Sequence, residues 1–115
     1  MTYFNNAYYG KKVLVTGNTG FKGSWLSLWL TSLGAKVAGF SDKIPTIPSN
    51  FEILGLNNDI KHYDGDVRDR DRLAQVIDDF KPEMVFHLAA QSIVSESFLN
   101  PRLTFETNIM GMVNL

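Results

Sequence analysis

The sequence predicts an α/β fold, a doubly wound parallel sheet of which only the N-terminal portion, about four strands with their crossover helices, is present. Two observations predict it. Lys12–Thr16 is a short, β-branched apolar run next to glycine, which suits a strand buried on both faces. From there to the end of the chain, strand-like runs alternate with apolar residues at helical spacing, and this alternation is typical of a parallel sheet with helical crossovers.

The first three expected elements form a β-α-β unit. After the strand at 12–16 and a glycine-rich loop comes a helix of about three turns that stops at Gly34. Its apolar residues include Trp25 and Trp29, one turn apart, which we expect to pack in the core. Lys36–Phe40 is the second strand, and a connection through a helix fits a right-handed parallel crossover.

The alternation resumes after an interruption. Ser41–Asn58 contains Pro45 and Pro48 and is predicted as a loop, with a helical turn near Phe51–Leu54. The remaining expected elements are a weak strand at Ile60–Tyr63, an amphipathic helix that begins near Arg68 and ends before Pro82, a strand at Met84–Leu88, and a helix from about Pro101 to the end with Phe105, Ile109, Met112 and Val113 on its apolar face.

Composition and charge argue against several classes of function. The 115 residues are 44% apolar and 20% charged, which is the composition of one globular domain with a core. Eleven basic and twelve acidic residues give a formal charge of -1, so no nucleic-acid partner is expected. The absence of cysteine excludes disulfides and thiolate metal sites, and we expect no metal. Met1–Gly10 lacks a secretory pattern and no apolar run has the length of about 18 residues that spans a bilayer, so a cytoplasmic protein without membrane contact is expected.

The loop between the first strand and the first helix predicts a dinucleotide site. Gly17, Gly20 and Gly23 follow one another at spacings of three. In a Rossmann-like fold the first glycine permits a tight turn, the second lets the backbone approach a pyrophosphate, and the third lets the helix pack on the strand. The diphosphate then lies at the helix N-terminus, where unpaired N–H groups favour an anion. A P-loop is disfavoured because no Gly-Lys-Ser/Thr triplet closes the loop.

Residues at the ends of the next strands bear on which dinucleotide binds. Ser41 and Asp42 stand where an acceptor for the adenosine ribose is expected. Asp42 would repel a 2′-phosphate and accept from a 2′-hydroxyl, which favours NAD, whereas Lys43 would argue for NADP. The alternative is that Asp42 is a solvated loop charge. Asp66 would meet the adenine edge together with Val67, or would cap the following helix.

These residues resemble the extended short-chain dehydrogenase/reductases. The match consists of the glycine loop, Thr16–Gly23, and of His87–Gln91, which reads HLAAQ. Within this family, Gly20–Leu26 and the Pro45–Glu52 loop are similar to the CDP-glucose 4,6-dehydratases. The Pro45–Glu52 loop is the specific match, because the glycine loop would also fit epimerases and reductases. The resemblance covers nearly the whole chain from Lys12 onward.

The resemblance implies a cofactor site shared between several loops. The glycine loop would line the pyrophosphate, the segment after the fourth strand would touch the ribose and diphosphate, and Asn108 would lie beneath the nicotinamide. The alternative for Asn108 is an amide bonded to nearby backbone inside a helix. Ser92–Glu96 departs from the family, which carries proline and basic residues there, so no substrate contacts are carried over to it. The predicted cofactor-binding residues are Gly17, Thr19, Gly20, Phe21, Lys22, Gly23, Ser41, Asp42, Asp66, Val67, Leu88, Ala89, Ala90, Gln91 and Asn108.

His87 lies beside the expected cofactor, but we interpret it as structural. A strand histidine is more often satisfied by a structural hydrogen bond than used as a base.

The resemblance also implies an activity, the dehydration of a nucleotide sugar with NAD as cofactor. The hydride leaves C4 of the sugar, water is lost across C5 and C6, and the hydride returns to C6, with the tyrosine of a Tyr-x-x-x-Lys pair as base. We expect the 115 residues to lack that pair and assign no catalytic residue. They are therefore interpreted as the N-terminal part of an NAD(P)-binding domain, residues 1–115, inactive on its own.

Two further expectations concern partners and alternatives. Ending at Leu115 would leave a sheet edge and an apolar helix face uncovered, so we expect self-association with a second copy. The parent protein would bind a nucleotide-sugar substrate. Another nucleotide-sugar epimerase or reductase, and a non-catalytic dinucleotide-binding module, remain as alternatives.

Overall fold

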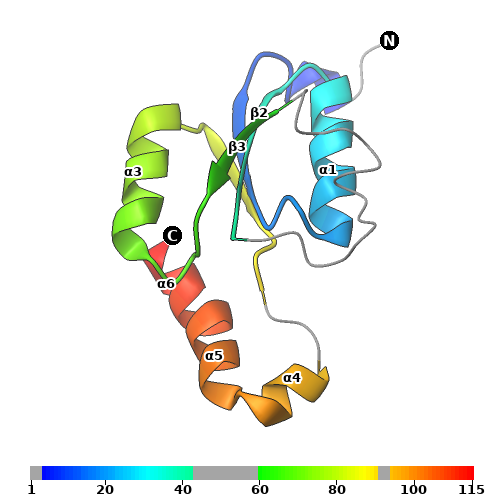
Figure 1. The fold of residues 1–115 in the computed structure, drawn as a ribbon. Helices are drawn as coiled ribbons and strands as arrows, with labels where there is room; N and C mark the ends of the chain where they lie inside the picture. Colours follow the sequence, from blue (N-terminus) through cyan, green and yellow to red (C-terminus); the bar gives the residue numbers. More distant parts are fainter. Residues whose placement is uncertain (1–3, 43–59, 91–93) are drawn as a thin grey trace.

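A computed structural model describes residues 4–42, 60–90 and 94–115 (Figure 1). Its elements in chain order are the 3-10 helix η1 (Phe4–Asn6), β1 (Lys12–Thr16), α1 (Phe21–Ser32), β2 (Lys36–Ser41), β3 (Lys61–Asp64), α3 (Arg70–Phe80), β4 (Met84–His87), α4 (Val94–Leu99), α5 (Pro101–Phe105), the π-helical turn η3 (Glu106–Met110) and α6 (Gly111–Asn114).

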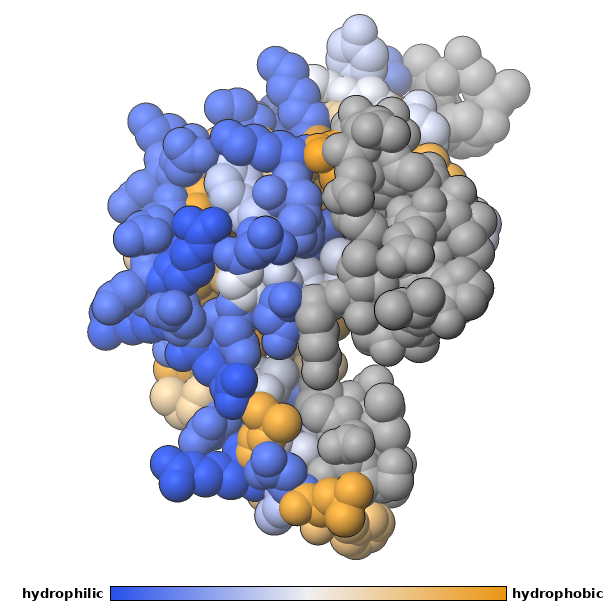
Figure 2. Space-filling view, in the orientation of Figure 1, coloured by the Kyte–Doolittle hydropathy of each residue, from blue (hydrophilic) through white to orange (hydrophobic). Residues whose placement is uncertain are grey.

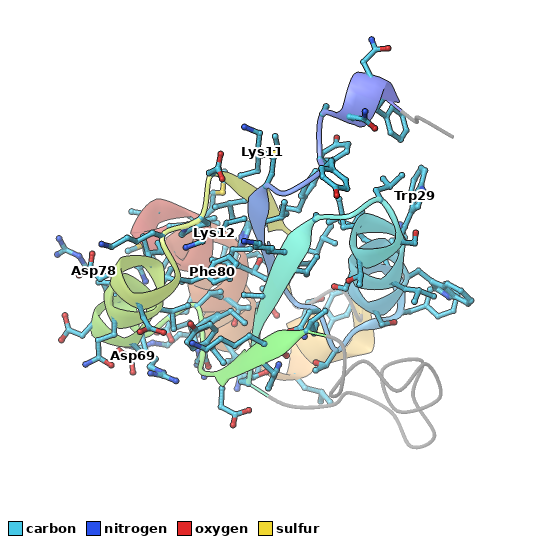
Figure 3. All side chains as sticks on the ribbon, turned by 90° about the horizontal axis from the view of Figure 1, so that it is seen from above. Lys11, Lys12, Trp29, Asp69, Asp78 and Phe80 are labelled. Carbon is cyan, nitrogen blue, oxygen red and sulfur yellow. The ribbon has the colours of Figure 1, made fainter. Side chains whose placement is uncertain are left out.

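The strands form one parallel sheet in the order β3-β2-β1-β4. The chain first moves outward from β1 to β3 and then returns to place β4 on the other side of β1. Val13 is therefore paired with Val37 on one side and with Met84 on the other. Helix α1 covers one face of the sheet and α3 the opposite face (Figures 1 and 3). The doubly wound α/β fold predicted from the sequence is confirmed, and the strand order reverses at β1, which is where such folds bind ligands.

Alternating residues of the strands build a separate core on each face. Val13, Val15 and Val37 pack with Leu30 on the α1 side, whereas Leu14, Ala38 and Phe40 pack with Leu73 and Val76 on the α3 side. Val13, Leu14 and Val15 are all 0% exposed, so β1 is buried on both faces as predicted. In Figure 3, Phe80 lies on the side of α3 that faces the sheet and Asp78 on the side that faces away.

Helix α1 packs on the sheet through small residues. Its buried members are Gly23, Ser24, Ser27 and Leu30. The hydroxyls of the two serines are satisfied inside the helix, since Ser27 Oγ donates to Gly23 O at 2.7 Å and Ser24 Oγ to Phe21 O at 3.0 Å. The prediction that Trp25 and Trp29 pack in the core is wrong, because they are 49% and 54% exposed. A Cβ on Gly23 would lie 2.1 Å from Gly17 O, so the first turn of α1 approaches the loop too closely for a side chain at that position.

Several element boundaries differ from the predictions. Asp69 rather than Asp66 caps α3, because its side chain accepts a hydrogen bond from Arg72 N, and the helix begins at Arg70. Its end before Pro82 is confirmed, with Lys81 in a left-handed conformation at φ 54°. Strand β2 extends to Ser41, β3 lies one residue later than predicted, and β4 ends at His87. The predicted helical turn at 51–54 and the Pro45–Glu52 loop lie outside the described residues.

A helical arm, Val94–Asn114, follows the sheet and ends beside α3 (Figure 1). Its first helix, α4, is not predicted from the sequence. The predicted helix from Pro101 is confirmed, and Asn100 caps it by accepting from Leu103 N at 3.1 Å. The apolar side chains expected on this helix are largely exposed, at 62% for Phe105, 53% for Ile109, 59% for Met112 and 67% for Val113. Apolar atoms gather at the lower end of the molecule in Figure 2, over this arm. In the described part of the chain, no helix is long and apolar enough to cross a membrane.

Candidate cofactor-binding site

The turn that follows β1 can be made only with glycine at its first position. Gly17 has φ 72°, a left-handed conformation, and its N–H donates to Phe40 O of β2 at 2.8 Å. A Cβ on Gly17 would lie 2.8 Å from both Ala89 N and Leu88 C. The glycine loop therefore lies directly against the backbone that follows β4, as the carboxyl ends of neighbouring parallel strands require.

The N-terminus of α1 opens at this same edge of the sheet. Gly20 is its N-cap, and no side-chain hydrogen bond caps the helix there. A Cβ on Gly23 would lie 2.1 Å from Gly17 O, so the first turn packs tightly on the loop. Ser24 N donates to Gly20 O at 2.9 Å, which leaves the amides of residues 21–23 as those without an intrahelical carbonyl. Three N–H groups and the positive end of the helix dipole thus form a site suited to an anion.

Side chains around the loop leave that corner open. Phe21 is 71% exposed and points into solvent, and Lys22 is exposed as well. Thr19 turns inward, where its Oγ1 lies 2.6 Å from Ser41 Oγ at the end of β2. Both of these side chains are buried, whereas Asp42, the next residue, is exposed. The acceptor that β2 presents to solvent at this edge is thus the carboxylate of Asp42.

Thr16 joins the ends of β1 and β4 through its hydroxyl. Thr16 Oγ1 accepts from Leu88 N at 3.0 Å and from Ala89 N at 3.2 Å, and it lies 2.7 Å from His87 Nδ1. With two donors already directed at the oxygen, the hydroxyl hydrogen points to Nδ1, which fixes the neutral imidazole with its proton on Nε2. Burial also lowers the pKa of His87, which favours the same neutral form. The contact with Thr16 supports the structural interpretation of His87, and Thr16 is a residue that sequence reasoning missed.

The turn after β3 holds Asp66 through Arg68. Oδ1 of Asp66 accepts from Arg68 N at 2.9 Å, and Oδ2 accepts from Arg68 Nε at 2.9 Å and Nη2 at 2.6 Å. These hydrogen bonds from Arg68 hold the pKa of Asp66 below its ordinary value. The carboxylate is therefore ionised and fixed in place, with its side chain 26% exposed.

Asn18 is a second residue of the loop that the sequence did not single out. Its side chain is 0% exposed and fills the space above Gly39 of β2, where a Cβ would lie 2.1 Å from Asn18 Cγ. Asn18 Nδ2 lies 3.2 Å from His62 Nδ1 of β3, and His62 Nε2 lies 3.0 Å from Asp64 Oδ1. The loop is thus anchored across three strands. A single sequence carries no signal for this contact, because it depends on the register of β2 with β3.

The spacing Tyr-x-x-x-Lys does occur once, at Tyr8 and Lys12, contrary to the expectation that the chain lacks it. The two side chains lie on opposite faces of the sheet. Tyr8 packs on the α1 side, where its ring lies 6.3 Å from that of Phe86, whereas Lys12 Nζ lies 5.9 Å from the Phe80 ring on the α3 side. The pair therefore cannot share a proton, and no catalytic role follows from it.

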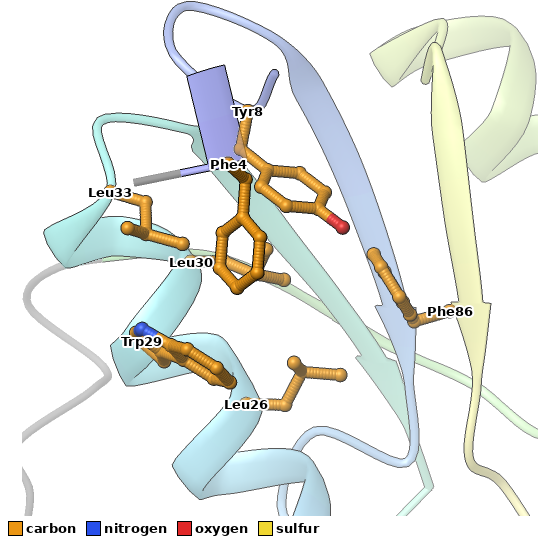
Figure 4. A pocket seen from close by; sticks show the side chains of 7 residues that line it. All are labelled: Phe4, Tyr8, Leu26, Trp29, Leu30, Leu33 and Phe86. Atoms are coloured by element: carbon orange, nitrogen blue, oxygen red, sulfur yellow. The ribbon is translucent and has the colours of Figure 1, made fainter. Parts of the chain in front are cut away.

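An apolar pocket of about 150 Å³ lies on the α1 face (Figure 4). Its lining is Phe4, Tyr8, Leu26, Trp29, Leu30, Leu33 and Phe86. Since no residue of the predicted cofactor set lines it, the pocket and the glycine loop are distinct features.

The remaining predicted residues are placed as follows. Ala90 is exposed just after β4, Asn108 is exposed within η3, and Gln91 lies outside the described residues. Within the described ranges, no group of three or more His, Cys, Asp or Glu side chains could hold a metal ion.

Comparison with known proteins identifies the family. The sequence profile of the GDP-mannose 4,6 dehydratase family matches residues 14–115. The chain belongs to this family. It is 54% identical to CDP-glucose 4,6-dehydratase of Salmonella typhimurium over 110 residues, which are 96% of this chain and 31% of that enzyme. It is 33% identical to GDP-mannose 4,6-dehydratase of Vibrio cholerae over 112 residues, 91% of this chain and 30% of that enzyme. The resemblance predicted from the sequence is confirmed, and the chain spans about a third of the length of these relatives.

Solved structures of the same dehydratase and epimerase group share the fold. UDP-glucose-4-epimerase of Stenotrophomonas maltophila, with bound NAD and formylated UDP-arabinopyranose, superposes with a TM-score of 0.80 at 31% identity, over 91% of this chain and 32% of that one. The complex of Thermus thermophilus UDP-glucose 4-epimerase with NAD gives 0.79 at 32% identity, over 90% of this chain and 32% of that one. The Rossmann-like assignment is thereby confirmed.

Proposed function

We propose that residues 1–115 form an NAD-binding Rossmann-like domain. The observation that carries this proposal is the uncapped N-terminus of α1. It lies close to the end of β4 because neither Gly17 nor Gly23 carries a side chain. The amides of residues 21–23 would bind the pyrophosphate, Asp42 the adenosine ribose, and the Asp66–Val67 turn the adenine. Leu88–Gln91 would touch the ribose and diphosphate, and Asn108 would lie beneath the nicotinamide. The NAD-bound epimerases of the same fold support this arrangement.

The charge at the end of β2 supports NAD over NADP. Asp42 is exposed there, and a carboxylate repels a 2′-phosphate but accepts a hydrogen bond from a 2′-hydroxyl. Calorimetric titration of the 115-residue chain is expected to give tighter binding of NAD than of NADP. Asp42→Asn removes the charge while keeping the shape, and it should narrow the difference between the two affinities. Equal affinities in the unchanged chain would contradict the assignment of Asp42.

For the whole protein, the function that the comparisons support best is a lyase that dehydrates CDP-glucose to its 4-keto-6-deoxy form. The 54% identity to the Salmonella enzyme favours this activity over the alternative, a nucleotide-sugar epimerase or reductase. When bound, NAD would supply the hydride acceptor, while this chain would bind and orient it. The Tyr-x-x-x-Lys spacing at Tyr8 and Lys12 supplies no base there, since the two side chains lie on opposite faces of the sheet. The 115-residue chain should therefore not convert CDP-glucose.

Mass spectrometry tests the activity, because dehydration removes one water from the sugar nucleotide. Full-length protein with NAD should give that product, and the 115-residue chain should give none. Epimerisation without loss of mass by the full-length protein would overturn the dehydratase assignment in favour of the alternative. Binding of NAD without conversion of any nucleotide sugar by the full-length protein would favour a non-catalytic module.

We also propose that the chain self-associates through the helical arm. Phe105, Ile109, Met112 and Val113 recur at helical spacing and are each more than half exposed, and soluble monomers rarely leave large apolar surfaces uncovered. Light scattering should show a mass that rises with concentration, and Ile109→Glu should shift the chain toward the monomer. Trp25→Glu, at an exposed position of α1, is the matched control and should leave the association unchanged. A constant monomer mass over a wide concentration range would contradict the proposal.

A further inference from the structure

Hydrogen bonds from the helical arm, more than forty residues later in the chain, hold the turn after β3. We propose that α6 positions the adenine site, with Asn114 and Gly111 as positioning residues. This inference rests on the proposed NAD function, because the turn it concerns is the one that would meet the adenine.

Asn114 fixes the backbone of the turn. Its Nδ2 donates to Val67 O at 3.0 Å and to Arg68 O at 3.3 Å. These carbonyls belong to the peptides 67–68 and 68–69, whose N–H groups already donate to Asp66 Oδ1 at 2.9 Å and to Asp66 O at 2.8 Å. Asn114 therefore completes a hydrogen-bonded turn that fixes the preceding Val67 N–H beside the Asp66 carboxylate, and these two groups would offer adenine one donor and one acceptor. This combination is complementary to the amino group and ring nitrogen on one edge of adenine.

Gly111 sets the distance between the arm and the turn. It is buried, and a Cβ at this position would lie 2.6 Å from Val67 Cγ2 and 3.2 Å from Val67 Cβ. Val67 is only 4% exposed and belongs to the core on the α3 face. The helix can therefore approach closely enough for Asn114 to reach the backbone only because position 111 has no side chain.

Charges reinforce the same contact at the surface. Arg68, which holds Asp66, also pairs with Glu106 of η3, where Nη1 lies 3.7 Å from Oε2. Glu106 is held in turn by Arg102 one helical turn earlier, whose Nε lies 2.7 Å from Oε1. Arg68 donates three hydrogen bonds to the Asp66 carboxylate, one to Oδ1 and two to Oδ2, so one lone pair of Oδ1 is left for an adenine amino group. The arm thus fixes both the backbone and the carboxylate of the turn.

The test compares the adenine turn with the glycine loop in the same molecule. Asn114→Asp is nearly isosteric but places a carboxylate against two carbonyl oxygens, and it is expected to weaken binding of NAD and of AMP about tenfold. At saturating NAD, hydrogen exchange should show protection of the amides of 21–23 in both proteins, but protection of the Val67 amide only in the unchanged chain. A loss of structure would instead reduce protection at both places. Met110→Gln, at an exposed position of the same arm outside the proposed association surface, is the matched control and should bind NAD normally.

A second variant keeps the test decisive if Asn114→Asp does not fold. Glu106→Gln removes one charge at the surface, leaves Asn114 and Gly111 in place, and should weaken AMP binding several-fold. A folded Asn114→Asp protein that binds AMP as the unchanged chain does would overturn the positioning role alone. Failure of the unchanged chain to bind NAD or AMP at all would overturn the proposed function with it.

Discussion

Replacing Gly23 by alanine probes the packing on which the proposed anion site depends. The added Cβ would meet Gly17 O at 2.1 Å, Gly17 C at 2.8 Å and Asn18 Cα at 3.0 Å. All of these are backbone atoms, and Gly17 is itself anchored by its hydrogen bond to Phe40 O. The clash therefore cannot be relieved by rotation of a side chain, and either α1 or the loop has to move.

The expected loss of stability follows from two opposing effects. Overpacking of this kind costs about 3 kcal/mol when backbone must shift. Alanine offsets about 1 kcal/mol of that through its greater helix propensity, since Gly23 lies inside α1. The free energy of unfolding should thus fall by about 2 kcal/mol, which lowers the melting temperature of a domain of this size by about 8 °C.

Gly20→Ala separates stability from binding. A Cβ on Gly20 would lie 3.3 Å from Gly17 O, so a shift of a few tenths of an ångström accommodates it and the melting temperature should change little. The same methyl group would project at the corner proposed for the pyrophosphate, so NAD affinity should fall at least tenfold. Thermal unfolding and calorimetric titration of both variants are the measurements. An unchanged melting temperature for Gly23→Ala, or normal NAD affinity for Gly20→Ala, would refute the reasoning.

Three more predictions concern the strands beneath the loop. Thr16→Val removes the buried hydroxyl that accepts from Ala89 N and that shares the Leu88 N–H with Thr16 O, and it should cost about 1–3 kcal/mol in urea unfolding; a cost near zero would contradict the hydrogen bonds described. Burial lowers the pKa of His87 from 6.5 in the folded chain, so the free energy of unfolding should be highest above pH 6.5 and should fall as the pH drops toward the pKa of the folded state. An NMR titration of His87 with a midpoint above 6.5 would contradict this direction. Gly39→Ala should displace the buried Asn18 amide and destabilise the chain by about 1–3 kcal/mol, measured in the same way, whereas Gly10→Ala, with nothing within 4 Å, should lose only the backbone preference of its left-handed φ.

Local sequence patterns were sufficient for the order and type of most elements. The β-branched run of β1 and the glycine that follows it are short-range features, because strand and helix periodicity and the conformational freedom of glycine act within a few residues. The bounds of β1 were predicted to the residue. The same reasoning placed Gly34 at the end of α1, where its φ is 88°. Helix α4 was missed, since its six residues, VSESFL, are too few to establish a helical apolar repeat.

Partners distant in the chain were beyond such patterns. Asp66 and Asp69 are both acceptable N-caps by sequence. In the structure Asp69 caps α3, because the carboxylate of Asp66 is already hydrogen-bonded to Arg68. Trp25 and Trp29 have the spacing of core residues, yet each is about half exposed.

By itself, the sequence therefore determined the doubly wound α/β topology and the glycine loop, whose causes are local backbone preference and apolar periodicity. Only the tertiary structure decided which face of α1 is buried, because that depends on how closely Gly23 lets the helix approach Gly17. It also decided which side chains meet across the fold: Thr16 with His87, 71 residues apart, and Asn114 with Val67, 47 residues apart. Such contacts arise from strand register and helix packing, which bring together residues that no short segment relates.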